Sequence, residues 1–289
     1  MTKSKRFHQL FVAEFFPKPF DIFARKPRVL IWVVINFIFF WLPSTMYFIR
    51  PDLSLILYIL VLCIAISAPA EWLMRVFEDA RHVATQTEKQ RLLPLFNEVY
   101  ERAEEHSEHI SSNVKLYIID TININAMAIG SRTIAVTRGL METMSDEEIK
   151  GILAHEFSHI SNGDTTVSIL VSMATSFVFW GVMALSKLLR LLENEENTVG
   201  SIIAFIRAVL EFTVAYLLFV CSIIVSFGSR KREYIADEYA HTLGYRGQLL
   251  SALYKLYDMQ ISDKRDLLEK ARATHPKVCF RIEKLENYT

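Results

Sequence analysis

The amino-acid sequence predicts an α-helical integral membrane protein with four transmembrane helices and a cytoplasmic, mainly α (α+β) domain that carries a small β-sheet. Three observations support this fold class. Hydrophobic residues make up 52% of the 289-residue chain and are concentrated in long blocks. The sequence around these blocks is charged and mostly helical in pattern. Short strand-like segments follow one another between residues 114 and 136, which is enough for a small sheet.

Four apolar blocks are long enough to cross a bilayer, and they cover residues 29–49, 53–70, 165–186 and 202–227. The first three contain no charged residue, and only Arg50-Pro51-Asp52 separates the first two, which favours a transmembrane hairpin. Residues 187–201 are predicted to form an external loop. The fourth block contains Arg207 and Glu211, and we expect these side chains to pair near the outer interface.

Lysine and arginine residues set the predicted orientation. Seven of them lie before Val29, whereas the turn after the first block has only Arg50, and a basic triplet at residues 230–232 follows the fourth block. Because basic residues stay on the cytoplasmic side, we expect both termini and both polar segments to be cytoplasmic. Residues 1–28 would form a cytoplasmic N-terminal segment, in which phenylalanines at positions 7, 11 and 15 fit an interfacial helix and an ordinary packed helix equally well.

The two polar segments, residues 75–164 and 229–289, are predicted to be two parts of one domain, because neither alone has enough apolar sequence for a core. The first is helical through Glu108 and then contains strands at 114–119, 122–129 and 133–136, and the second is helical. A formal net charge of zero predicts no nucleic-acid partner, and three scattered cysteines are typical of a reducing cytoplasm.

The most specific motif in the chain is His155-Glu156-Phe157-Ser158-His159. On a helix, positions i and i+4 share one face, so both imidazoles can reach one metal ion while Glu156 points at its water. Ser145 and Glu148 form a predicted capping box that begins this helix. The pattern indicates a zinc hydrolase with one Zn²⁺ per chain. Its alternative is a helix whose two histidines are ordinary core or surface residues.

A catalytic zinc site needs a third protein ligand. Asn162 and Thr165 stand where a metzincin would have glycine and histidine, so the sequence argues against that class. Glu233 and Asp237 share one helical face; Glu233 could complete a His-His-Glu site, and Asp237 could accept the second ring proton of a ligand histidine. The alternative is a charged patch that solvates a juxtamembrane helix. His241 is a rival ligand, although a surface histidine is the simpler interpretation.

Four stretches of the sequence, in this order, resemble one family of membrane enzymes: Asn125-Ala126-Met127-Ala128, the HEFSH run with Asn162-Gly163-Asp164, the REYIAD run, and Thr274-His275-Pro276 with Arg281-Ile282. In these stretches the chain resembles the HtpX-like membrane metalloproteases, which are gluzincins related to the CAAX prenyl proteases. The resemblance covers most of the sequence from Val114 onward. It implies a gluzincin-type domain in which His155, His159 and Glu233 bind Zn²⁺ and Glu156 is the general base.

The resemblance also implies roles for four other residues. His275 and Arg281 would stabilise the developing oxyanion; the alternatives are helix capping or packing for His275 and a salt bridge for Arg281. Asn125 and Ala126 would lie on an edge strand near the metal, where an extended substrate adds as a further strand. The alternative for Asn125 is a turn or strand-end asparagine.

The motif and the apolar blocks predict a membrane-bound zinc-dependent endopeptidase, and the resemblance implies one of the bacterial cytoplasmic (inner) membrane that acts in protein quality control. Zinc would lower the pKa of its bound water, and Glu156 would take the proton. Asp164 and Glu233 lie next to the third and fourth blocks, so the site would lie near the surface of the lipid bilayer. Its polypeptide substrates would then be unfolded or damaged membrane proteins. A CAAX-type prenyl-protein protease and a catalytically silent membrane scaffold that retains the motif are the alternatives.

Overall fold

The computed structural model describes residues 26–27, 29–34, 36–38, 51–192, 198–227, 229–262 and 278–288. The chain divides into two compact units, one made of Met1–Ala70 and Val167–Val225 and the other of Glu71–Thr166 and Ser226–Thr289. Nearly all of the predicted N-terminal segment, about half of the first apolar block, residues 193–197 of the predicted loop and His275 lie outside the described residues.

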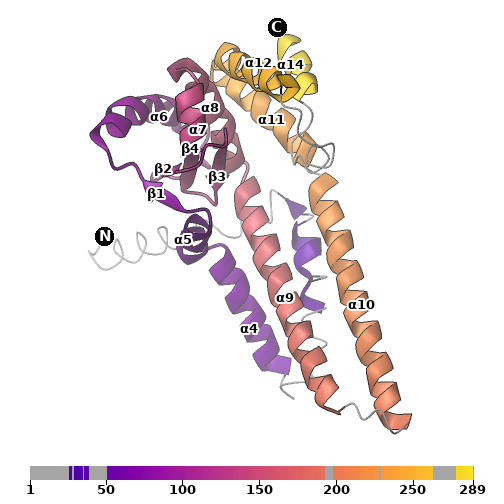
Figure 1. Ribbon diagram of the computed structural model, residues 1–289. Helices are drawn as coiled ribbons and strands as arrows, with labels where there is room; N and C mark the ends of the chain where they lie inside the picture. The colour runs from indigo at the N-terminus through magenta and orange to yellow at the C-terminus, as the bar shows by residue number, and fades with distance from the viewer. Residues whose placement is uncertain are drawn as a thin grey trace, which may run out of the picture. The chain divides into compact units, whose positions relative to one another are not determined.

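The first unit is made of apolar helices (Figure 1). It contains α4 (Pro51–Ala65), most of α9 (Asp164–Leu192) and most of α10 (Thr198–Phe227). Tyr58 of α4 is buried, and its hydroxyl donates to the carbonyl of Val33 at 2.9 Å, so the helical residues near Val33 pack along α4. Ser186 of α9 donates to Glu211 of α10, and the expected pair of Arg207 with Glu211 forms at 3.2 Å.

Over the described ranges, no single helix is both long and apolar enough to span a membrane by length and composition; Leu55–Ala65 and Ala68–Phe77 meet that test together, as a pair bent by 63°. The break lies inside the predicted block 53–70. Pro69 has no N–H with which to continue α4, and Ser67 Oγ donates to the carbonyl of Ile64 at 2.6 Å in the last turn. Helix α5 (Ala68–Phe77) therefore begins as a separate element.

The second unit contains a small mixed sheet. Its strands are β1 (Ala80–His82), β2 (Lys115–Ile119), β3 (Ala126–Ile129) and β4 (Thr133–Thr137), in the spatial order β1-β2-β4-β3. The central pair β2 and β4 is parallel and the outer pairs are antiparallel, which places β3 at an edge of this sheet. Three of these strands overlap the predicted ones, although the predicted strand at 122–129 begins only at Ala126. The three-residue β1 was not predicted.

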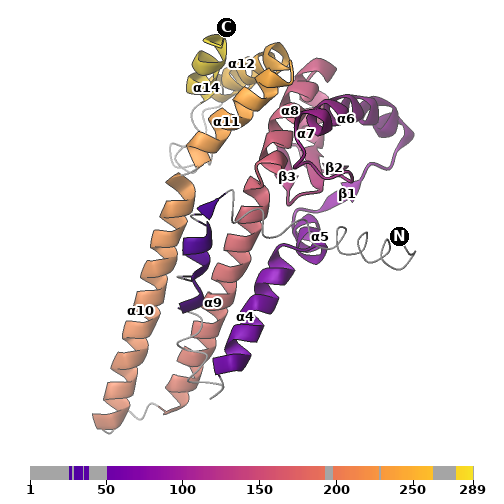
Figure 2. The same cartoon turned by 180° about the vertical axis from the view of Figure 1, so that it is seen from behind.

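The helices of the second unit surround α8 (Asp146–Ser161), which begins at the predicted capping box of Ser145 and Glu148. From opposite sides, Figures 1 and 2 show α8 between the sheet and α11 (Ser229–Thr242) with α12 (Arg246–Ser262). Helix α6 (Gln86–His106) also packs on α8, and its Tyr100 stacks on the fully buried Phe157 with ring centroids 5.7 Å apart. The shorter α7 (Arg138–Thr143) and α14 (Val278–Glu286) also belong to this unit.

Gly151 allows a close contact between α8 and α12. A Cβ atom at this position would lie 2.4 Å from the backbone nitrogen of Leu249 in α12, which is closer than real contacts allow. Glycine therefore lets α12 cross α8 one turn before the two histidines.

The described residues form a mostly helical protein with a small mixed sheet, as the sequence predicted.

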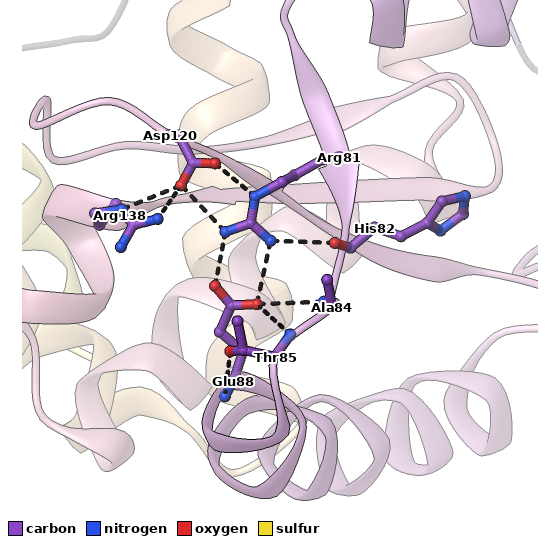
Figure 3. Close-up of polar contacts among 7 residues, drawn as sticks. All are labelled: Arg81, His82, Ala84, Thr85, Glu88, Asp120 and Arg138. Atoms are coloured by element: carbon purple, nitrogen blue, oxygen red, sulfur yellow. Dashed lines mark hydrogen bonds and ion pairs between the residues drawn. The ribbon is translucent and has the colours of Figure 1, made fainter.

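An ion network at the surface of the second unit ties β1 to its neighbours (Figure 3). Arg81 of β1 contacts Asp120 through Nε at 2.5 Å and Glu88, in the first turn of α6, through Nη2 at 2.7 Å. Arg138, the first residue of α7, also donates to Asp120. The hydrogen bonds from Arg81 lower the pKa of Glu88 to about 2 and that of Asp120 to about 2. This network joins β1 and the first turn of α6 to Asp120, which follows β2, and to the start of α7.

Candidate metal centre

Two helices bring the three predicted ligands together. His155 and His159 lie one turn apart on α8, and their rings meet edge to face with centroids 5.0 Å apart. Glu233 enters from α11: its Oε2 lies 3.4 Å from Nε2 of His155, and its Oε1 lies 3.8 Å from Nε2 of His159. The three donor atoms all lie within 4.8 Å of one another. His155 and Glu233 are buried, which restricts access of bulk water.

The donor set fits a zinc ion. Zinc binds imidazole nitrogen and carboxylate oxygen at about 2.0–2.2 Å, so the donors of a tetrahedral site are roughly 3.4 Å apart. The separations of 3.4 and 3.8 Å between Glu233 and the two histidines need only small side-chain adjustments to reach that value. Two imidazoles and one carboxylate leave a fourth position, as a hydrolytic site requires.

Asp237 lies one turn after Glu233 on α11 and holds the ring of His155. Its Oδ1 is 2.9 Å from Nδ1 of His155, and its side chain is buried. When Nε2 of His155 faces a metal, the ring proton must be on Nδ1, and Asp237 is the acceptor in reach. Asp237 thus contacts a candidate ligand histidine, and its role in fixing the tautomer stays a prediction.

Arg281 of α14 contacts the carboxylate of Asp237. Its Nη2 donates to Asp237 Oδ1 at 2.6 Å and its Nε donates to Oδ2 at 2.9 Å, which is a bidentate pair. Its Nη1 also lies 3.4 Å from Glu233 Oε2. The guanidinium thus contacts two carboxylates, that of Asp237 and that of the candidate ligand Glu233. This is the salt bridge that the sequence analysis weighed against an oxyanion role.

The charges around His155 oppose one another. Burial lowers its pKa and so does the positive charge of Arg281, but hydrogen bonds to Asp237 and Glu233 outweigh both and raise the pKa to about 9. Burial would raise the pKa of Asp237, yet the hydrogen bonds from His155 and Arg281 hold it below its ordinary value. The two carboxylates therefore favour the positively charged form of His155.

Two contacts of the site were missed by the sequence analysis. Asp164 Oδ2 lies 3.2 Å from Nδ1 of His159, because Gly163 adopts φ 67 and turns the chain back after α8. Each candidate histidine ligand thus has its own aspartate. Glu156 accepts a hydrogen bond from the backbone N–H of Ala128 in β3 at 2.9 Å. An acidic residue just past a helix-ending glycine could have indicated Asp164, whereas a main-chain donor such as Ala128 leaves no mark in the sequence.

The predicted substrate residues lie at the start of the edge strand. Asn125 donates its N–H to Thr137 Oγ1 at 2.9 Å, and its carbonyl accepts from Thr137 N–H at 3.0 Å, so its main chain faces β4. Because main-chain direction alternates along a strand, the groups of Ala126 face the outer edge, as those of Ala128 do towards Glu156. Of these two residues, Ala126 is therefore the one whose main-chain groups face away from β4.

His241, the rival ligand, stacks on Tyr288 with ring centroids 5.3 Å apart and is not part of the three-residue group. His275 lies outside the described residues.

Comparison with known proteins defines the class of this molecule. Residues 86–289 match the family described as Peptidase family M48, and this region includes the α8 motif and Glu233. The chain belongs to Peptidase family M48.

Within this class the chain is similar to Protease HtpX of Shewanella baltica (strain OS185), with 33% identity over 146 residues, which cover 48% of this chain and 51% of the relative. It is 32% identical over 201 residues to Protease HtpX homolog of Streptococcus uberis, covering 60% of this chain and 67% of that one. The chain thus spans about half the length of the first of these relatives. The resemblance to HtpX-like proteases is confirmed.

The structure is also similar to the crystal structure of S. mikatae Ste24p, with a TM-score of 0.52, 18% sequence identity, and coverage of 98% of this chain and 66% of that one. At this identity the likeness concerns the fold alone.

Proposed function

We propose that this protein is a membrane-bound zinc-dependent endopeptidase that hydrolyses unfolded or damaged membrane proteins at the cytoplasmic surface of the membrane. The observation that carries the proposal is the meeting of His155, His159 and Glu233 within 4.8 Å beside a glutamate held by the edge of a sheet. Membership of a peptidase family supports the reaction class.

Different residues have different roles in the proposed reaction. A bound zinc ion would supply a water of lowered pKa and polarise the scissile carbonyl. Glu156 takes the proton of the attacking water and passes it to the leaving amine, because Asp237 and Asp164 contact the rings of the candidate ligands whereas Glu156 accepts from Ala128 N–H. The hydrogen bond from Ala128 N–H fixes the direction of Glu156. Asp237 and Asp164 hold the rings of His155 and His159.

Arg281 acts in this proposal as a positioning residue and not as an oxyanion ligand. Its bidentate bond holds Asp237 against His155, and its Nη1 also contacts Glu233 Oε2. A guanidinium with these partners stabilises the ligand set before any substrate binds.

Main-chain pairing at β3 accounts for the substrate class. The outward groups of Ala126 offer hydrogen bonds that every extended polypeptide can make, so shape is read more than sequence. A folded domain cannot present an extended segment to β3 without unfolding locally. Unfolded chains are therefore the preferred substrates.

The membrane arrangement is proposed from the sequence pattern. Residues 29–49, 53–70, 165–186 and 202–227 cross the bilayer, and residues 75–164 and 229–289 form the catalytic domain on the cytoplasmic side. The second unit, Glu71–Thr166 with Ser226–Thr289, supports this division because it nearly coincides with the two cytoplasmic segments. Labelling of single cysteines at the two termini of the protein in intact and permeabilised cells tests the orientation. A C-terminus reached only from outside contradicts it.

Hydrolysis of casein by the purified full-length protein, loaded with zinc in detergent, tests the reaction. We expect Glu156→Gln to keep the metal and lose activity, and Glu233→Ala to lose most of the metal, because a ligand sets affinity whereas the base acts on the water. Glu147→Gln is the matched control, since Glu147 is on the same helix but exposed to solvent.

Other outcomes would select the alternatives. Zinc binding without Glu156-dependent hydrolysis of any unfolded or membrane-derived polypeptide would favour the silent scaffold. Cleavage confined to prenylated C-terminal peptides would favour the CAAX-type protease.

A further inference from the structure

Helix α5 carries its charges inward and its apolar side chains outward, the reverse of a helix on the surface of a soluble protein. Glu71 is buried, whereas Trp72, Leu73, Val76 and Phe77 are 57%, 37%, 54% and 73% exposed. With the exposed Pro69 before them, these residues follow the i, i+3, i+4, i+7, i+8 spacing of one helical face. Four large apolar side chains on one face form a patch that water does not favour.

The inward face of α5 is bonded to the sheet. Glu71 Oε1 accepts hydrogen bonds from the N–H and the hydroxyl of Ser131, at 2.7 and 2.9 Å. Arg75 donates to Thr133 Oγ1 at 2.9 Å, and its guanidinium lies 5.0 Å from the ring centre of Tyr117. The polar face of α5 is thus bonded to the rest of the second unit, and the helix cannot rotate to bury its apolar face without breaking these contacts.

The β3–β4 turn is shaped to receive α5. Gly130 has φ 63, and a Cβ atom there would lie 2.3 Å from the side chain of Glu71, so only glycine permits this approach. On the other side, Thr165 in the first turn of α9 donates to the carbonyl of Gly130. Glu71 directly follows the predicted block 53–70, and Thr165 begins the predicted block 165–186. Both residues that hold this turn therefore adjoin proposed membrane spans.

We propose that α5 is an interfacial helix whose face of Trp72, Leu73, Val76 and Phe77 lies in the boundary between lipid headgroups and acyl chains. Through the bonds of Glu71 to Ser131, this contact with lipid positions the β3–β4 turn and with it the substrate-binding strand β3. The lipid surface is the occupant that these observations select. A tryptophan on an apolar face is typical of that boundary, and the helix follows an apolar segment after only two residues. The inference rests on the proposed membrane location.

Nitroxide scanning of the full-length protein in liposomes of phosphatidylcholine and phosphatidylglycerol tests the inference. In a background with Cys63, Cys221 and Cys279 replaced by serine, labels are placed singly at positions 72, 76 and 77. A label at Glu104, which is exposed on α6, reports water, and a label at Ile59 of α4, 50% exposed, reports the proposed span. Collision with oxygen and with a water-soluble nickel chelate is measured for each label.

We expect the three α5 labels to collide severalfold more with oxygen than with nickel chelate, relative to the label at Glu104. Labels as open to nickel chelate as Glu104 would overturn the inference. Labels shielded from both reagents would also overturn it, because another protein segment would then cover the face. If the label at Ile59 reads lipid while those of α5 do not, the membrane proposal stands and only the inference fails.

A second measurement tests the link from α5 to the substrate strand. The double substitution Val76→Glu and Phe77→Glu changes only exposed side chains, so zinc content should match the wild type. We expect the KM for casein in liposomes to rise and to return towards the wild-type value in detergent, where no flat surface exists. An unchanged KM in liposomes would overturn the positioning role. Loss of Glu156-dependent hydrolysis in every sample, with the lipid pattern intact, would instead refute the proposed function.

Discussion

Two arginines of the second unit make the same kind of contact in opposite surroundings. Arg81 binds Asp120 through two nitrogens, at 2.5 and 3.1 Å, and Arg281 binds Asp237 through two nitrogens, at 2.9 and 2.6 Å. The side chains of Arg81 and Asp120 are 31% and 39% exposed, whereas those of Arg281 and Asp237 are 9% and 2% exposed. The chemistry is shared, and only access to water differs.

The difference shows what each pair contributes. At the surface, water competes for both ions, so Arg81 adds little free energy and mainly joins β1 to α6 and to Asp120, which also binds Arg138 of α7 (Figure 3). In the interior, both ions have lost their hydration, and the pair by itself is no better for stability than a well-packed apolar pair. Its value is that Asp237 is held, ionised, against a candidate zinc ligand.

The largest effect is expected for Arg281→Met, which leaves the buried Asp237 without its partner. Breaking a buried pair costs about 3–5 kcal/mol of stability, and disturbing the support of a ligand weakens metal binding by about 10- to 100-fold. Thermal unfolding and competition for zinc with a chelator measure the two quantities. Zinc affinity equal to that of the wild type would show that Arg281 does not support the ligands.

Arg281→Lys sharpens the comparison, because it keeps the charge and loses the two-pronged contact. We expect a stability loss of about 1–3 kcal/mol, smaller than for methionine, together with a clear loss of zinc affinity. Full recovery of zinc affinity by lysine would mean that charge alone matters at this position.

For the surface pair, Arg81→Met should lower stability by only about 1 kcal/mol and leave zinc affinity unchanged. Arg102→Met removes another exposed ion pair, with Glu98 at 3.4 Å, together with a hydrogen bond to the Leu243 carbonyl and a contact with the Tyr245 ring, and should likewise leave zinc affinity unchanged. A loss of zinc affinity on changing Arg81 would mean that the two arginine sites are coupled.

The smallest effect is a pH dependence of that surface contribution. The pKa values of Glu88 and Asp120 fall from 4.5 and 3.8 to about 2, so the stabilisation is complete above the ordinary values and is lost as the pH falls towards 2. The difference in unfolding temperature between the wild type and Arg81→Met should be constant near neutrality and shrink below about pH 4.5. A difference that grows on acidification would contradict this assignment.

The sequence predicted those parts of the molecule that depend on local spacing. The helical face shared by His155 and His159, the capping box at Ser145 and the mainly helical fold with a small sheet all follow from patterns within a few residues. The break between Ala65 and Ala68 was missed because an apolar run hides a helix end, and the strand β1 was missed because three residues carry too little pattern.

The features of the candidate site that the sequence left open depend on topology. Whether Arg281 faces an oxyanion or Asp237 is decided by how α14 packs on α11, and the residue type allows both. The direction of the Asn125 main chain depends on the pairing of β3 with β4, which a shift of one residue would reverse.

The hydrogen bond from Ala128 to Glu156 has a consequence for how this protein tolerates mutation. Its donor is a main-chain N–H, so nineteen of the twenty residues encoded at this position keep the donor, and only proline removes it. A histidine ligand can be lost through one base change in its codon, whereas the support of the glutamate survives almost any such change. The residue at position 128 is therefore limited only by the space available to its side chain and by the exclusion of proline. The direction of Glu156 depends on the backbone of β3 and not on the side chain at position 128.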